Sequence, residues 1–294
     1  MNFLSGEILY IDKPLGWTSF DVVKRVRGAI TRRLHVKKIK VGHAGTLDPL
    51  ATGVVIVTTG RATRQIEQLQ AGVKEYVATV AFGATTPSFD METEIDATYP
   101  ADHVTADSVR AVLPQFVGRI EQVPPAFSAV KIGGMRAYDM VRNGEDPKLK
   151  AKVLVIDQIE LLDFRPAGQA DIGGDGEGHD LPSRKVTRRV SPVHDTLPVA
   201  VIRIVCSKGT YIRALARDLG QALGTGAHLV GLRRTRVGNV TLDDCLTMDE
   251  TARLIREAPL PDPEPESRPE PSDISDNSEP SDNSELSDTT PAKS

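Results

Sequence analysis

The 294-residue sequence predicts a fold that mixes helices with strands. Runs of β-branched and other apolar residues with strand character alternate with stretches whose apolar residues recur at helical spacing. The proportions of 39% hydrophobic and 26% charged residues are typical of a globular, water-soluble protein. No apolar run reaches membrane length and the N-terminus has no signal-peptide pattern, so a cytoplasmic location is expected. The two cysteines, Cys206 and Cys245, form neither a CxxC pair nor a ligand cluster, which agrees with a reducing compartment.

The N-terminal residues are predicted to form a short strand over 7–13 and then a helix. Thr18 or Ser19 is expected to cap this helix, because either hydroxyl can accept a hydrogen bond from its first turn. Four apolar residues at helical spacing should face the core: Val22, Val23, Val26 and Ile30. From Lys24 to Lys40 the chain carries eight Lys or Arg residues and no acid. This run is either a solvated helix face or a surface for nucleic-acid phosphates with salt-dependent binding, and its place before the next motif favours phosphates.

The loop Gly42–Gly53 (GHAGTLDPLATG) is the feature around which the chain is organised. Its three glycines permit tight turns or close backbone approach. Asp48 precedes Pro49, which restricts the aspartate to an extended or turn conformation. The apolar run Val54–Val57 should be a buried strand that anchors the loop. Taken alone, Asp48 is a common kind of turn residue; the alternative is a carboxylate that a rigid loop holds for catalysis.

The middle of the chain also alternates between predicted helices and predicted strands. In order, the pattern predicts a helix over residues 60–70, a strand over 74–83, a helix over 106–113 and a strand over 153–162. Tyr76, in the first of these strands, would on its own be a half-buried packing residue. Residues 124–150 mix Pro, Gly and basic residues with few apolar repeats, so we expect a loop-and-helix excursion outside the core.

Residues 165–198 contain a glycine-rich run and no aromatic residue. We therefore expect a flexible insertion that cannot bury enough surface to order itself. Val199–Cys206 is predicted to be a strand, followed by a helix that ends at Gly224. Arg213 falls in the first turn of that helix, where a cation meets the positive end of the helix dipole. A carboxylate partner would offset this.

The end of the chain divides into a last helix and an acidic tail. Thr247 and Glu250 form a capping box for a helix that ends near Ala258. Residues 259–294 hold ten acidic residues, two basic residues, eight prolines and eight serines, a composition that predicts disorder. The whole chain carries −4 and this tail −8, so residues 1–258 carry +4, which permits nucleic-acid binding.

Several common catalytic motifs are absent from the sequence. It has no P-loop, dinucleotide fingerprint, GxSxG, HExxH or Cys/His metal spacing. We therefore expect a chemistry that needs no metal ion and no organic cofactor.

Five separated segments carry motifs that occur together in one family. They are Lys13–Ser19 (KPLGWTS), Gly42–Gly53, Phe116–Lys131 (FVG and QVPPAFSAVK), Ser207–Arg213 (SKGTYIR) and Gly226–Arg234 (GAHL and LRR). In these motifs and in their order, the chain resembles the TruB-type tRNA pseudouridine synthases from about residue 7 to 250. One departure is Pro87, which stands where the family usually has an acid, whereas Asp90 matches the pattern.

The resemblance implies an α+β pseudouridine synthase fold, in which a mixed, largely antiparallel central sheet is flanked by helices around a catalytic cleft. Residues 1–258 would form this catalytic domain, with 124–150 as an RNA-contacting excursion and no PUA domain after it. The implied activity is isomerisation of uridine-55 in the T-loop of tRNA to pseudouridine. The target base must first be flipped out of its stack. The glycosidic C1′–N1 bond then breaks and a C1′–C5 bond forms.

Asp48, Tyr76 and Arg213 are the catalytic residues that the resemblance implies. Asp48 would act in covalent catalysis, and Tyr76 would stack against the target base. Arg213 would pair with Asp48, which keeps the carboxylate ionised and fixes its direction. Three routes stay open: attack of Asp48 on C1′, loss of uracil by C2′ deprotonation to a glycal with Asp48 as base, or addition of Asp48 to C6.

Substrate binding is implied for Tyr76 and for three further residues. Tyr211 would line the pocket, Leu232 would contact the base from another wall, and His43 would hold the T-loop where the uridine leaves it. The expected partner is the T-stem-loop of tRNA, with neither guide RNA nor membrane, and the expected protein is a monomer. The alternative function is a tRNA-binding and folding module whose chemistry is incidental, which the joint presence of the three catalytic residues disfavours.

Overall fold

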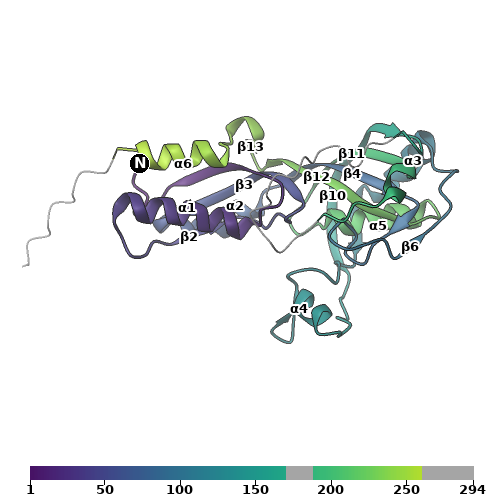
Figure 1. Cartoon of the computed structure of the whole chain (residues 1–294), viewed down its shortest axis with the longest axis horizontal. Helices are drawn as coiled ribbons and strands as arrows, with labels where there is room; N and C mark the ends of the chain where they lie inside the picture. The colour runs from purple at the N-terminus through teal and green to yellow at the C-terminus, as the bar shows by residue number, and fades with distance from the viewer. Residues whose placement is uncertain (170–187, 260–294) are drawn as a thin grey trace, which may run out of the picture. The chain divides into compact units, whose positions relative to one another are not determined.

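A mixed β-sheet forms the centre of the protein in the computed structural model, which describes residues 1–169 and 188–259 (Figure 1). Within these residues the sheet has nine strands: β1 (Ile8–Lys13), β2 (Val41–His43), β3 (Ala51–Thr59), β4 (Lys74–Phe82), β7 (Gly118–Gln122), β10 (Lys152–Arg165), β11 (Val199–Cys206), β12 (Ala227–Val237) and β13 (Val240–Thr241). Their order is β1-β3-β12-β4-β11-β10-β7, with β2 paired to β3 and β13 to β12. Every pair is antiparallel except β3 with β12, which confirms the expected mixed, largely antiparallel sheet.

Helices and short strand pairs surround this sheet. The helices are α1 (Ser19–Leu34), α2 (Ile66–Ala71), α3 (Ala106–Val112), α4 (Ala137–Arg142), α5 (Ile212–Ala222) and α6 (Met248–Glu257), with 3₁₀ turns η1 (Gly60–Gln65), η2 (Leu113–Phe116), η3 (Pro192–Thr196) and η4 (Leu242–Asp244). The short pairs are β5 (Ala84–Thr85) with β6 (Ala97–Thr98) and β8 (Lys131–Ile132) with β9 (Met135–Arg136). α1 and α6 pack against each other, whereas α5 packs on β12 (Figure 1). In the described part of the chain, no helix combines the length and the apolar character that a membrane span requires.

Helix α1 confirms the prediction made from its pattern. Thr18 is the N-cap and forms a capping box with Asp21, in which each side chain accepts a hydrogen bond from the other residue's backbone N–H. The four predicted inward-facing residues are all buried: Val22, Val23, Val26 and Ile30. The last predicted helix is confirmed in the same way, because α6 begins with a capping box of Thr247 and Glu250.

Strand β3, which follows the glycine-rich loop, is buried in the core. Of its nine residues only Thr52 is partly exposed. Val55 and Val57 point into the main core cluster, whereas Val54 and Ile56 belong to a second cluster on the other face of the sheet. Burial on both faces explains why this strand is a continuous apolar run without alternation. The expectation of a buried strand behind the loop is thus confirmed.

Strand β12 lies in the middle of the sheet, although the sequence pattern did not predict a strand there. Its basic residues, Arg233, Arg234 and Arg236, hide the usual apolar alternation. It runs parallel to β3, where Arg234 is opposite Gly53. Gly53 has a φ of 107°, and a Cβ built on it would lie 2.2 Å from the Arg234 carbonyl oxygen. Glycine is therefore required at this position both by the backbone conformation and by the close approach of β12.

Part of residues 188–198, which we expected to belong to a flexible insertion over 165–198, packs against the core instead. His194 and Leu197 in this segment are only 1% and 6% exposed. The composition argument was wrong for them because their few apolar groups join a cluster built by other segments and need no core of their own. Residues 170–187 of the same stretch lie outside the described residues. So does the tail predicted to be disordered, apart from Pro259.

We expect Gly53→Ala to lower the free energy of unfolding by about 3 kcal/mol, because the new Cβ adds a clash to an unfavourable positive φ. Chemical denaturation of the purified protein measures this. Gly118→Ala is the matched control, since Gly118 has a φ of 87° but nothing within 4 Å of its added Cβ. That variant should lose only about 1 kcal/mol. Equal losses in the two proteins would contradict the close approach of β12.

Candidate functional site

The loop between β2 and β3 presents Asp48, and a buried arginine from β12 holds its backbone. Arg234 is 1% exposed. Its nitrogens donate to three carbonyls: Val54 O at 2.8 Å, Thr46 O at 3.3 Å and Gly45 O at 3.4 Å. Buried carbonyls need donors, and a guanidinium offers several in a fixed planar geometry. Arg234 thereby fixes the conformation of the loop on the N-terminal side of Asp48.

Two residues near the N-terminus also hold the loop. Ser19 Oγ accepts a hydrogen bond from Leu47 N at 2.8 Å and donates one to Leu47 O at 3.1 Å. Lys13 is fully buried, and its Nζ donates to Pro49 O at 3.4 Å. Burial lowers the pKa of the Lys13 ammonium to about 7, an effect that the neighbouring Asp48 carboxylate opposes. The backbone on both sides of Asp48 is therefore tied to β1 and α1.

Asp48 is the carboxylate partner that the place of Arg213 in the first turn of α5 led us to expect. Arg213 Nε donates to Asp48 Oδ2 at 2.9 Å. The side chain of Arg213 is 6% exposed, whereas that of Asp48 is 38% exposed. Asp90 is a second partner, with its Oδ2 3.5 Å from the same Nε. The aspartate that the loop presents is thus fixed by a buried cation and remains accessible itself.

The rest of the Arg213 guanidinium is held by backbone carbonyls. Nη1 donates to Ser88 O and Nη2 to Phe127 O, both at 3.0 Å. Burial alone would lower the pKa of Arg213, but the charges of Asp48 and Asp90 outweigh it and raise the pKa above its ordinary value. The guanidinium is permanently charged, and contacts from three other segments of the chain determine where it points.

Asp90 is buried more deeply than Asp48. Burial raises its pKa, which Arg213 and two hydrogen bonds oppose. Those bonds come from Ser88 Oγ at 2.6 Å and from the Glu92 backbone N–H at 2.9 Å, both to Oδ1. Asp90 therefore has one oxygen bound to its own turn and the other directed at the arginine. This arrangement suits a positioning role for Asp90.

Gln122 fixes the start of α5, and with it the base of the Arg213 side chain. Tyr211 is the N-cap residue of α5 but makes no side-chain capping bond. Instead, Gln122 Oε1 accepts from Tyr211 N at 2.9 Å, and its Nε2 donates to Tyr211 O at 3.2 Å. Gln122 is 1% exposed, so its side-chain amide and the Tyr211 backbone are paired away from solvent. The QVPPAFSAVK motif thus contributes structure as well as a carbonyl ligand for the arginine.

Asp48 and Arg213 lie on the wall of a cavity of about 380 Å³. The other charged residues that line it are Asp90, Arg188 and Arg233. Much of the remaining wall is apolar and comes from Leu15, Leu50, Val77, Met91, Val230 and Leu232. An apolar pocket with a few convergent charged groups is the usual form of a small-ligand or base-binding site.

The cavity brings together half of the residues that the sequence nominated for the site. Those that line it are Asp48, Arg213 and Leu232. The other three do not line it: Tyr76, Tyr211 and His43.

The two tyrosines lie near Asp48 without opening into the cavity. Tyr76 is 8% exposed and belongs to the main core cluster. Side chains alternate along β4, so the neighbours that reach the cavity are Val77 and Thr79. Burial is the main cause that raises the pKa of both Tyr76 and Tyr211, and the Asp48 carboxylate adds to it. Both phenols are therefore within electrostatic range of the carboxylate.

His43 lies in β2, directly before the loop. It is half-buried, and burial lowers its pKa. The positive charge of Arg234 lowers the pKa further, whereas the backbone of Gly45 opposes the shift. Its imidazole is thus biased toward the neutral form.

The sequence reasoning missed three charged residues of the cavity: Asp90, Arg188 and Arg233. Asp90 did carry a signal, since it matches the family pattern, but nothing linked it to Arg213. Arg188 lies in a basic run over 184–189 and Arg233 in the LRR motif, but neither pattern indicated a place in the cavity. In the structure Arg188 Nε donates to Met91 Sδ at 3.3 Å and an Nη donates to Val230 O at 3.5 Å. These bonds place its guanidinium on the wall of the cavity.

A buried histidine pair docks the segment that contains Arg188. His194 Nε2 lies 3.1 Å from His228 Nε2, and His228 Nδ1 lies 3.0 Å from Ala84 O. A carbonyl only accepts, so His228 Nδ1 carries a proton and its Nε2 accepts from His194. Ser191 N–H donates to His194 Nδ1 at 3.0 Å, which completes a chain of bonds between neutral rings. Burial lowers the pKa of both rings, that of His228 to about 4.

The site can therefore supply one oriented carboxylate to a group bound in the cavity. Asp48 Oδ2 is engaged by Arg213, which leaves Oδ1 to act as a nucleophile or base. In residues 1–169 and 188–259, no group of three or more His, Cys, Asp or Glu side chains is placed to hold a metal ion.

Two family models match the chain. The model described as TruB family pseudouridylate synthase (N terminal domain) matches residues 32–173. The model described as tRNA pseudouridylate synthase B C-terminal domain matches residues 213–260. The first contains Asp48 and the second contains Arg213, so the ion pair of the site joins the two matched regions.

Curated relatives match over most of their length. The tRNA pseudouridine synthase B of Phocaeicola vulgatus is 57% identical over 249 residues, which cover 85% of this chain and 93% of the relative. The protein of the same name from Flavobacterium johnsoniae is 40% identical over 246 residues, covering 83% of this chain and 94% of the relative.

Solved structures agree on the fold. The archaeal box H/ACA Nop10–Cbf5 complex contains a chain with 26% identity and a TM-score of 0.53, covering 86% of this chain and 54% of that one. A Cbf5–Nop10–Gar1 complex gives 28% identity and the same TM-score of 0.53, over 85% of this chain and 54% of that one. This chain thus spans about half the length of those proteins.

We expect the free energy of unfolding to fall as the pH is lowered from about 6.5 to 4. In this range the His228 ring takes up a proton in the unfolded chain but stays neutral in the folded protein. Acidification therefore lowers the free energy of unfolding by on the order of 3 kcal/mol. Chemical denaturation at a series of pH values measures the fall. His228→Gln stays neutral throughout, and its amide can both donate to Ala84 O and accept from His194. This variant should lose a comparable part of the pH dependence, and parallel curves for the two proteins would contradict the assignment.

Proposed function

The chain belongs to the TruB family of pseudouridylate synthases, and from this membership we propose that it isomerises the T-loop uridine, uridine-55, of tRNA to pseudouridine. As a member of the family it is an isomerase that acts on tRNA. The position of the target uridine and the mechanism are the parts that we propose here.

One observation carries the proposal: an accessible carboxylate held 2.9 Å from a buried arginine at the wall of a cavity. The carboxylate's backbone is fixed on both sides by buried donors, so little reorganisation is needed when a substrate arrives. Such preorganised charge is the usual source of catalytic power. A cavity of about 380 Å³ offers an apolar wall for a base that has left its stack.

In the proposed reaction the T-loop uridine flips into the cavity with its C1′ near Asp48. The C1′–N1 bond breaks, the uracil turns over in the pocket, and a bond forms between C1′ and C5. The proton on C5 is then lost and N1, which kept the electron pair of the broken bond, takes up a proton, so the product is an isomer of the substrate. Asp48 acts either by attack on C1′, as the base that removes the C2′ proton, or by addition to C6. Arg213 keeps the carboxylate charged and directed in each route.

Three further roles complete the proposal. Leu232 lines the cavity and supplies an apolar contact to the base. Tyr76 is the residue that we assign to stacking on the target base, and because it is buried in the free protein, that contact forms only when RNA opens the site. Tyr211 and His43, both half-buried near the loop, are assigned to the pocket wall and to the T-loop respectively.

We propose that the protein works on tRNA without a guide RNA. Relatives with up to 57% identity carry the name tRNA pseudouridine synthase B. The chains from H/ACA complexes are only 26–28% identical and are about twice as long as their matched part. The proposal therefore follows the more similar proteins.

We expect Asp48→Asn to lower kcat for pseudouridine formation in a T-stem-loop transcript by on the order of 10³-fold or more, since it removes the reacting group. RNA affinity should stay within a few-fold of wild type. The amide keeps the shape of the side chain, and Asp90 still neutralises the buried Arg213, so the variant should fold. Pseudouridine mapping by chemical labelling and primer extension reads the product.

The matched control is Asp107→Asn, which changes the same charge at an exposed side chain of α3 that forms an ion pair with Arg110. It should leave turnover unchanged. An Asp48→Asn protein that still forms pseudouridine at the wild-type rate would refute the proposed role. Measuring tRNA refolding with the same variant tests the alternative function. A chaperone-like activity would persist without Asp48, and finding it as the sole activity of the wild-type protein would replace the proposal.

A further inference from the structure

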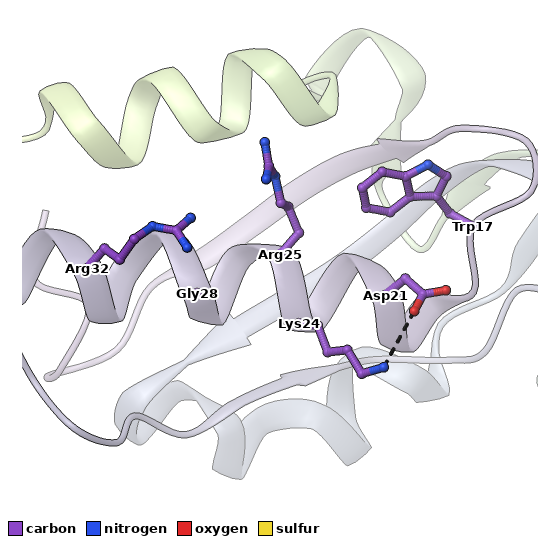
Figure 2. Close-up of a pocket in the computed structure, with 6 residues that line it drawn as sticks. All are labelled: Trp17, Asp21, Lys24, Arg25, Gly28 and Arg32. Atoms are coloured by element: carbon purple, nitrogen blue, oxygen red, sulfur yellow. Dashed lines mark ion pairs between the residues drawn. The ribbon is translucent and has the colours of Figure 1, made fainter. Parts of the chain in front are cut away.

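A second hollow, separate from the catalytic cavity, opens on the surface of α1 (Figure 2). Its volume is about 300 Å³. Figure 2 shows Arg25 and Arg32 extending from α1 on the side of the Trp17 ring, with Gly28 between them. Since one water molecule occupies about 30 Å³ in the liquid, the hollow has room for a group larger than a few waters. Its residues take no part in the catalytic cavity.

The cations of α1 fall into two groups with different uses. Arg27 donates to Val41 O and Arg33 to Ala258 O, each at 3.2 Å, so these two stabilise the packing of the helix. Arg25 and Arg32 are exposed and have no hydrogen-bond or ion-pair partner within residues 1–169 and 188–259. They are seven residues apart, two helical turns, and therefore lie on the same face about 10 Å apart along the axis.

Asp21, the acidic residue beside the hollow, already has other partners. Asp21 Oδ2 accepts hydrogen bonds from the Thr18 N–H at 3.0 Å and from Thr18 Oγ at 2.6 Å. Its Oδ1 lies 3.7 Å from Lys24 Nζ, and Figure 2 shows this pair on the other side of the helix from Arg25. The carboxylate is thus capped and partly neutralised. The net charge that faces the hollow is positive.

Gly28 gives the hollow its shape. A glycine in the middle of a helix costs roughly 0.5–1 kcal/mol relative to alanine. Packing does not demand it here, because a Cβ built on Gly28 would meet only Arg32 Nη1, at 3.6 Å, an ordinary contact. The missing side chain therefore leaves free space between the two guanidinium groups.

The hollow adjoins the catalytic loop through one short turn. Leu15 lines the catalytic cavity, and Trp17, two residues later, forms the end wall of the hollow. Lys13 Nζ binds Trp17 O at 2.6 Å as well as Pro49 O beside Asp48. Beyond α1 the positive charge continues at the exposed Lys37, Lys38 and Lys40. A polyanion seated in the catalytic cavity can therefore continue along α1 over a surface of matching charge.

We propose that the hollow over Gly28 is a second RNA-contact site, in which Arg25 and Arg32 hold a backbone phosphate of the tRNA substrate and Trp17 forms the end wall. The inference rests on the proposed function only in that RNA is the substrate. Two guanidinium groups set on one face of a helix match a phosphodiester, which offers two unesterified oxygens. The contact adds affinity without taking part in the chemistry.

The chain contains one tryptophan, so its fluorescence reports on this site directly. We expect Trp17 emission to change when tRNA is titrated into the full-length protein. In Arg25→Ala/Arg32→Ala the dissociation constant should rise roughly tenfold, and the salt dependence of log K should flatten by about 1 to 2. kcat at saturating RNA should stay within about twofold. Arg110→Ala/Arg165→Ala, which removes two exposed cations of α3 and β10, is the matched control and should bind as wild type does.

The Gly28→Gln variant distinguishes RNA binding in the hollow itself from attraction of RNA by the positive charge of α1 alone. It fills the hollow, keeps every charge and favours the helix, so the protein should fold and yet bind tRNA several-fold more weakly. A Gly28→Gln protein with wild-type affinity would overturn the site, and so would equal losses in the double variant and its control. Weaker binding by the α1 variants of a protein that makes no pseudouridine would support this site and refute the proposed function, so the two failures are distinguishable.

Discussion

The site depends on the burial of one guanidinium. Arg213 is 6% exposed, so its charge must be neutralised and its N–H groups must all find acceptors. The acceptors come from the loop with Asp48, from the turn with Ser88 and Asp90, and from the segment with Phe127. Three pieces of chain that are distant in sequence are therefore held around one cation. The carboxylate that reacts is one of the groups that this cation orients.

The need of buried polar groups for hydrogen-bond partners also explains why few of the motif residues face the cavity. Lys13, Ser19, Gln122 and Arg234 all bind backbone atoms, and each of them is buried. Their common task is to hold an irregular loop and a helix start, where the sheet supplies no hydrogen bonds of its own. These four motif residues are therefore structural. A rigid frame of this kind allows a single carboxylate to be placed for reaction.

Local pattern predicted much of this fold, because its signals act over short range. The capping boxes at Thr18 and Thr247, the buried face of α1 and the apolar β3 all follow from neighbours in sequence. What was missed depends on distant contacts. β12 was hidden by its arginines, which other strands and the loop accommodate, and His194 is buried only because His228 receives it. Tyr76 shows the limit for the site, since the family resemblance nominates it but only packing reveals that it faces the core.

The parallel pairing of β3 with β12 has a consequence for how the protein folds. It joins residues as far apart as Thr52 and Arg233, which are 181 positions apart, and closing so long a loop is slow compared with forming a helix. During synthesis the N-terminal part leaves the ribosome before β12 exists. The loop with Asp48 therefore lacks the hydrogen bonds of Arg234 until β12 has been made, and a nascent chain without β12 has no complete site for RNA. The site is complete only when the chain has been made at least through Arg234.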